Sequence, residues 1–154
     1  MQPQTTVKPP ERRARSQHEI QHLMTSRTDA LSLYSELASK RPFKPEHNTQ
    51  QLLQNFCEML VDYTATAHFQ LYRHIDEERE RRQAVLQVAD EIYPTIAEIT
   101  QTILDFNDKY DCSDHCSNLD ELANDLSLIG ERLADRIELE DRLIQVLMAP
   151  RSDN

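Results

Sequence analysis

Apolar residues recur every three to four positions along most of this chain, which is the spacing of one face of an α-helix. Four such stretches are separated by short polar or proline-containing segments. They predict one helix over about 15–39, a second that includes 52–75, a third over about 83–110 and a fourth over about 119–148. No strand-like alternation competes with these patterns. The chain is therefore expected to be all-α, an antiparallel four-helix bundle.

Proline and charge mark the limits of these elements. Residues 1–14 contain three prolines and no periodic apolar pattern, so we expect a disordered N-terminal segment there and a bundle domain over 15–149. Pro94 falls inside the third helix and predicts a kink or a new start. The charged run 76–82 is expected to form a frayed turn between the second and third helices.

The second predicted helix has two unequal faces. Its inner face carries the expected core residues, which are Leu53, Phe56, Cys57, Leu60, Val61, Thr64, Ala67, Leu71, Tyr72 and Ile75. The outer face should be charged, but it holds small and apolar residues around one carboxylate, namely Met59, Asp62, Ala65, Thr66 and Phe69. A surface of this composition suits contact with a partner better than simple solvation. We therefore expect this face to bind another molecule.

Three polar side chains fall on stripes that should face the core. Glu140 lies close to the centre of the fourth helix's stripe, Arg27 lies on that of the first helix, and His68 lies on that of the second. A buried polar group needs a hydrogen-bonding partner. One interpretation is a structural network in which Arg27 pairs with Glu140 and His68 donates to a neighbour. The other is a polar cavity that binds a ligand.

Composition narrows the class of protein. The chain has 154 residues with one glycine and no tryptophan, which favours a single, mostly helical domain. Its net charge of −10 disfavours direct binding to nucleic acid and favours a basic protein partner. No apolar run approaches the ~20 residues needed to span a membrane. The N-terminus lacks the apolar region of a secretory signal, so we expect a reducing cytoplasm.

Candidate metal and catalytic patterns are incomplete. Glu19 and His22 have the Glu-x-x-His spacing of di-iron bundles, but no second copy exists. The loop with Cys112, His115 and Cys116 lacks a distant second ligand pair, and a metal site or a redox-responsive thiol pair there remains a minor alternative to an ordinary polar loop. No catalytic set or phosphate-binding glycine loop stands out. We therefore expect no metal, no cofactor and no enzymatic activity.

Short motifs in the last three helices carry a resemblance that covers about 15–148. They are Phe56-Cys57, Leu60-Val61-Asp62-Tyr63, His68-Phe69, Ile92-Tyr93-Pro94, Phe106-Asn107-Asp108, Ile129-Gly130-Glu131 and Leu139-Glu140-Asp141. Their order and spacing resemble the Rsd/AlgQ family, the regulators of sigma D. The resemblance implies a bacterial anti-sigma factor that binds the C-terminal domain of the primary sigma factor, the domain that reads the −35 promoter element. Such binding blocks use of the sigma factor by core RNA polymerase and favours alternative sigma factors in stationary phase.

The resemblance also implies roles for particular residues. Asp62 matches an aspartate that the family needs for sigma binding, and Leu23 is the candidate contact on the first helix, which also carries part of the partner surface. The polar core or cavity is expected to include Arg27, His68, Tyr72, Glu140 and Asp141. The first helix keeps Arg27 but lacks the family's tryptophan. Two alternatives therefore stay open: an adaptor of the same fold that binds another signalling protein, and a bundle that binds a small ligand or metal.

Overall fold

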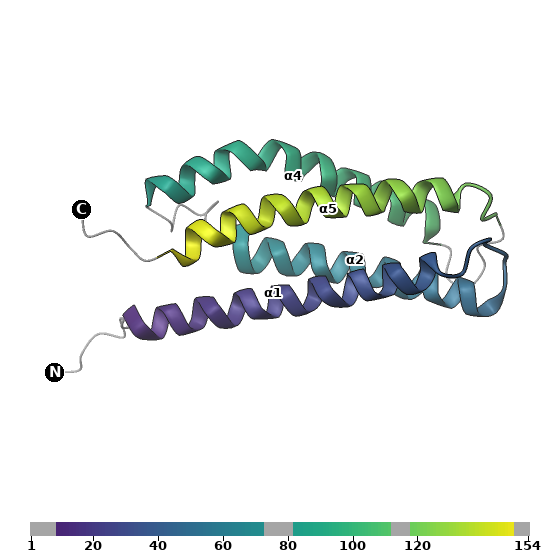
Figure 1. Cartoon of the computed structure of the whole chain (residues 1–154), viewed down its shortest axis with the longest axis horizontal. Helices are drawn as coiled ribbons and strands as arrows, with labels where there is room; N and C mark the ends of the chain where they lie inside the picture. The colour runs from purple at the N-terminus through teal and green to yellow at the C-terminus, as the bar shows by residue number, and fades with distance from the viewer. Residues whose placement is uncertain (1–8, 73–81, 112–117, 150–154) are drawn as a thin grey trace.

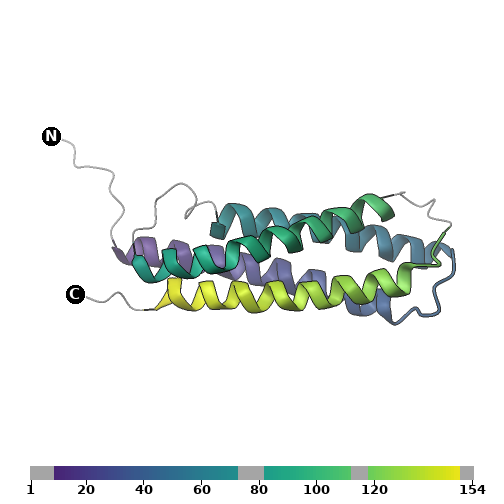
Figure 2. The same cartoon turned by 90° about the horizontal axis from the view of Figure 1, so that it is seen from above.

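The computed structural model describes residues 9–72, 82–111 and 118–149, and it forms an antiparallel bundle of four long helices. The elements are α1 (Pro9–Ala38), α2 (His47–Ala67), the π-helical turn η1 (His68–Tyr72) that continues α2, α4 (Gln83–Tyr110) and α5 (Leu122–Met148). Each long helix runs opposite to the one before it, so α1 begins and α5 ends at the same end of the bundle (Figures 1 and 2). The predicted all-α bundle is confirmed.

The helix limits differ from the predicted ones mainly at N-terminal ends. α1 begins at Pro9, six residues before the predicted start near Arg15, while 1–8 lie outside the described residues. α4 has the predicted bounds, contains Pro94 and curves along its length (Figure 1). α5 begins at Leu122, three residues later than expected. The predicted turn at 76–82 lies outside the described residues except for Arg82.

Aromatic rings and one close helix approach hold the core together. The Phe56 ring lies between those of Tyr34 and Phe106, with centroids 5.8 Å away on both sides. The Tyr34 hydroxyl donates a hydrogen bond to the Leu126 carbonyl at 3.1 Å. A Cβ added at Gly130 would lie 2.2 Å from that hydroxyl oxygen. The single glycine of the chain therefore lets α1 approach α5 closely.

The inner face of α2 is turned further toward α1 than the sequence predicts. Tyr63, which was not assigned to the core, is 0% exposed. Val61, which was assigned to the core, is 51% exposed, and His68 is exposed as well. Both residues lie on the side of α2 that faces α4. The apolar pattern alone does not reveal this rotation, because it arises from the polar contacts that Tyr63 makes inside the bundle.

Leu31 on α1 is 38% exposed, because the apolar stripe of α1 centres on Leu23, Ala30 and Leu37. Within the described ranges, no helix has both the length and the apolar content that a membrane crossing requires.

Candidate functional site

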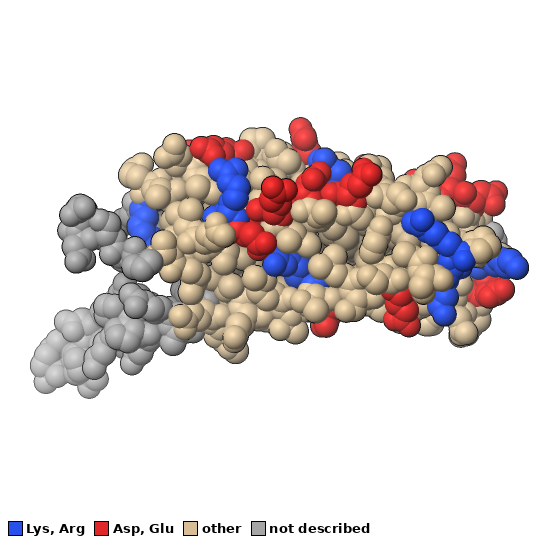
Figure 3. Space-filling view, in the orientation of Figure 1, with Lys and Arg blue, Asp and Glu red and all other residues tan. Residues whose placement is uncertain are grey.

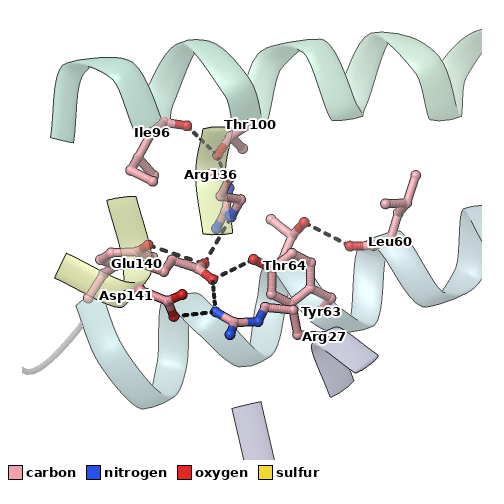
Figure 4. Close-up of polar contacts among 10 residues, drawn as sticks. Arg27, Leu60, Tyr63, Thr64, Ile96, Thr100, Arg136, Glu140 and Asp141 are labelled. Atoms are coloured by element: carbon pink, nitrogen blue, oxygen red, sulfur yellow. Dashed lines mark hydrogen bonds and ion pairs between the residues drawn. The ribbon is translucent and has the colours of Figure 1, made fainter. Parts of the chain in front are cut away.

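A buried carboxylate organises the centre of the bundle. Glu140 on α5 is 0% exposed, and its two oxygens accept hydrogen bonds from three side chains. The Tyr63 hydroxyl donates to Oε1 at 2.5 Å and the Arg136 Nε donates to Oε2 at 3.0 Å (Figure 4). The Tyr72 hydroxyl donates to Oε2 at 3.2 Å. The carboxylate thus links α5 to α2 and to η1. Because every donor is itself fixed by packing, the centre is a rigid hydrogen-bonded network.

Arg136, like Tyr63, is a member of this centre that sequence reasoning did not place there. It lies one helical turn before Glu140 and is 1% exposed. Its Nη1 donates to the Thr100 hydroxyl on α4 at 2.9 Å, so the guanidinium ties α5 to α4 as well. Its Cζ lies 5.4 Å from the centroid of the Tyr63 ring and 5.9 Å from that of Tyr72, within the range of cation–π attraction. The i, i+4 spacing of arginine and glutamate was the available signal.

The predicted pair of Arg27 and Glu140 exists, but it is not the main contact of either residue. The Arg27 Nη1 donates to the Asp141 Oδ1 at 3.0 Å and lies 3.6 Å from the Glu140 Oε1 (Figure 4). Four of the five residues expected in the polar centre therefore meet there: Arg27, Tyr72, Glu140 and Asp141. His68 does not. Its exposed ring packs edge-on against Phe69, with the centroids 5.2 Å apart, so its assignment to the core was wrong.

The electrostatics of the centre keep its donors protonated. Burial raises the pKa of Tyr63 and of Tyr72 above the ordinary value of 10.0, and the Glu140 carboxylate raises both further. Burial opposes the charge on Arg136, but Glu140 together with Tyr63 and Tyr72 more than offsets it, and the pKa of Arg136 is raised. These three groups remain donors throughout the neutral range. The arrangement suits a structural role better than proton transfer, which needs a pKa near the working pH.

The outer face of α2 forms a hollow with α1. All five residues predicted there (Met59, Asp62, Ala65, Thr66 and Phe69) line a depression of about 460 Å³. Its other wall comes mainly from α1, with His22, Thr25 and Asp29. Phe69 is 55% exposed, and Asp62 is exposed and makes no ion pair within the described part of the chain. The hollow thus offers an apolar ring and an available carboxylate to an approaching molecule.

Leu23, the sixth residue predicted to contact a partner, was wrongly assigned. Its side chain is 0% exposed and belongs to the core. It lies on the apolar stripe of α1, whereas the residue before it, His22, reaches the hollow. The contribution of α1 to this surface is therefore polar.

The cysteines offer little reactive chemistry where the structure describes them. Cys57 is buried, and burial, with Asp111 and Glu58 nearby, raises the pKa of its thiol to about 12. A thiol of this kind is protonated and unreactive at neutral pH. The loop with Cys112, His115 and Cys116 lies outside the described residues. No group of three metal-ligating side chains is found among the residues that are described.

Comparisons with known proteins agree with the motifs. The model of the family described as "Regulator of RNA polymerase sigma(70) subunit, Rsd/AlgQ" matches residues 4–148. A regulator of sigma D from Yersinia enterocolitica is 32% identical over 133 residues, which cover 82% of this chain and 78% of the relative. One from Salmonella paratyphi B is 36% identical over 128 residues, which cover 79% of this chain and 76% of the relative. No solved structure matches the chain. The chain therefore belongs to the Rsd/AlgQ family of regulators of the sigma-70 subunit of RNA polymerase, as its motifs predicted.

Proposed function

We propose that this chain is an anti-sigma factor that acts in the bacterial cytoplasm by binding the C-terminal domain of the primary sigma factor. The bound domain can then engage neither core RNA polymerase nor the −35 element, which favours alternative sigma factors. The chain acts by occupying a surface and carries out no catalysis. The contact surface is the hollow formed by the outer face of α2 with α1.

The observation that carries this proposal is the composition of that hollow. A helix-turn-helix domain that reads promoter DNA is basic, because it must contact phosphates. The hollow presents Asp62 beside the half-exposed ring of Phe69, on a chain of net charge −10. Such a surface attracts the basic domain over a distance and buries apolar area on contact. An acidic protein can in this way compete with DNA for one sigma surface.

The polar centre supports this surface from behind. Tyr63 directly follows Asp62 on α2, and its hydroxyl is anchored on Glu140. Tyr72 lies three residues after Phe69 and is anchored on the same carboxylate. Both ends of the contact surface are therefore held at a fixed rotation before a partner arrives. A preorganised surface loses less conformational entropy on binding.

Calorimetric titration of the full chain with the purified C-terminal domain of the primary sigma factor tests the proposal. We expect saturable binding that weakens as salt is raised, because exposed charges contribute to it. A duplex carrying the −35 element should compete with the chain for the domain. The matching domain of an alternative sigma factor is the control and should bind more weakly. Absence of binding to the primary sigma domain at low salt would contradict the proposal and would favour an adaptor with another partner.

A further inference from the structure

A second groove lies on the other side of α2, where α2 and η1 face α4. It has a volume of about 560 Å³. Val61 and Ala65 form its α2 wall, Ala97 and Leu104 form its α4 wall, and Arg136 reaches its floor. The rotation of α2 toward α1 leaves this groove open. It is thus a product of the same packing that buries Tyr63.

The groove gathers much of the exposed apolar surface of the molecule. Five large apolar side chains are exposed among the described residues, and three of them, Val61, Phe69 and Leu104, line this groove. Their exposed fractions are 51%, 55% and 46%. Isolated exposed apolar residues are ordinary, but a continuous group around a hollow marks an interaction site. Phe69 also borders the hollow toward α1, whereas Val61 and Leu104 belong to the groove alone.

The two helices that bound the groove are strongly acidic. Between them, α2 and α4 carry seven acidic residues (Glu58, Asp62, Asp90, Glu91, Glu98, Asp105 and Asp108) and one basic residue, Lys109. Glu58 lies three residues before Val61 and Asp108 lies four after Leu104, so each is next to an apolar wall residue on the helix surface. The face drawn in Figure 3 differs, because basic side chains lie among the acidic ones there.

One polar atom inside the groove lacks a donor. The Asn107 Oδ1 is buried and has no hydrogen-bond partner among the described residues, while its Nδ2 donates to the Cys57 carbonyl at 3.4 Å. Turning the amide over would place two oxygens together, so the buried oxygen is the unpaired atom. The cation on the floor, Arg136, is already neutralised by Glu140. The acidic residues of the two bounding helices therefore favour an occupant that carries positive charge.

We propose that the α2–α4 groove is a second docking surface, which takes a short amphipathic helix of a partner protein with apolar anchors and flanking lysine or arginine. The α4 wall runs from Tyr93 to Asn107, about 21 Å at ~1.5 Å per residue, which matches a helix of about 14 residues. Apolar side chains one turn apart enter between Val61 and Leu104, as in other helix-in-groove complexes. The basic side chains meet the acidic rims. This surface shares Ala65 and Phe69 with the hollow assigned to sigma, whereas Val61 and Leu104 lie outside that hollow.

The test uses a fluorescein-labelled, helical 14-residue peptide with leucines on one face and lysines beside them. Its control has the same leucines with glutamates in place of the lysines. Fluorescence anisotropy with the full chain should show saturable binding of the lysine peptide and at least about tenfold weaker binding of the glutamate peptide. This difference follows from the acidic rims.

Three neutral substitutions locate the bound peptide. Val61→Gln and Leu104→Gln should each lower the affinity for the lysine peptide by about tenfold, because each removes an apolar anchor site. Leu128→Gln on α5 is the matched control, since Leu128 is 49% exposed, and it should leave the affinity within about twofold. Circular dichroism melts of all three variants check that the fold is unchanged.

Binding of the sigma domain separates this proposal from the proposed function. Val61→Gln and Leu104→Gln should retain the domain at wild-type affinity. The groove would be overturned as a docking site if all three substitutions lowered the affinity for the peptide equally. Equal affinities of the wild-type chain for the lysine and glutamate peptides would overturn it too. Loss of the sigma domain in Leu104→Gln would make the groove part of the sigma surface, which overturns the second surface and leaves the anti-sigma role intact. Failure of the wild-type chain to bind the sigma domain would reject only the proposed function.

Discussion

The polar centre and the outer face of α2 each depend on a carboxylate, and the two carboxylates have opposite surroundings. Glu140 is 0% exposed and accepts hydrogen bonds from three side chains. Asp62, on the same helix as one of those donors, is exposed and has no ion pair within the described ranges. Removing a buried acceptor leaves its donors unpaired, whereas removing an exposed carboxylate costs the folded chain little. The centre should therefore control stability and the outer face should control binding.

The largest effect is expected when the centre is broken. Glu140→Ala leaves Arg136 as a buried charge without its carboxylate and should lower the free energy of unfolding by about 3–5 kcal/mol. Urea denaturation followed by circular dichroism measures the loss. Glu138→Ala, two residues away and exposed, is the control and should stay within about 0.5 kcal/mol of wild type. A loss below about 1 kcal/mol for Glu140→Ala would mean that water replaces the missing carboxylate.

Substitutions on the outer face of α2 should lower the affinity for the sigma domain and leave the stability of the fold nearly unchanged. Asp62→Ala and Phe69→Ala should each weaken binding of the sigma domain by about 2 kcal/mol, roughly thirtyfold, because charge and apolar contact are lost within the proposed interface. Both variants should unfold within about 0.5 kcal/mol of wild type. Calorimetric titration and urea denaturation on the same preparations give the two values. Wild-type affinity in both variants would remove this face from the proposal.

Alkaline pH should weaken the centre. The pKa of Tyr63 is raised on folding, so this residue stabilises the fold below its unfolded pKa near 10 and loses that contribution as the pH rises above it. Between pH 10 and pH 11 the stability of wild type should fall by about 1 kcal/mol more than that of Tyr63→Phe, which has no ionisable hydroxyl. Urea midpoints at the two pH values measure the difference. Parallel declines in the two proteins would contradict the buried, protonated state of Tyr63.

The smallest effect is expected at His68. Its ring is exposed and packs only on the neighbouring Phe69 in the contacts described for it. His68→Ala should therefore change the free energy of unfolding by less than about 0.5 kcal/mol. A thermal melt beside wild type is sufficient to measure this. A loss of stability comparable to that of Glu140→Ala would mean that His68 belongs to the polar centre. The distinction between the two sides of α2 would then fail.

The fold was largely predictable because helical periodicity is a local property of the sequence. The bounds of α4 follow from the apolar spacing alone, and the outer-face residues of α2 were identified because their composition departs from that of a solvated surface. The rotation of α2 was not predictable in the same way. Tyr63 replaces Val61 in the core because its hydroxyl reaches a carboxylate 77 residues away, and no local pattern contains that contact.

The composition of the polar centre illustrates the same limit. Glu140 was identified by its place on a stripe, but its nearest cation was assigned to Arg27 on another helix and not to Arg136 one turn away. From the sequence alone, the i, i+4 pair of Arg136 and Glu140 resembles an ordinary ion pair on a helix surface. Only the packing of Tyr63, Tyr72 and Thr100 around it makes it a buried residue. Leu23 was misplaced for a related reason, since it lies one position from the residue that reaches the hollow.

Nuclear magnetic resonance of the isotope-labelled chain, titrated with the unlabelled C-terminal domain of the primary sigma factor, tests the division between centre and outer face most directly. Amide signals of Asp62, Thr66 and Phe69 on α2, with those of His22 and Asp29 on α1, should shift or broaden most, because these residues line the proposed contact surface. Amides on the exposed side of α5 around Leu128 should stay in place. A footprint centred on α5, with the α2 signals unmoved, would contradict the account.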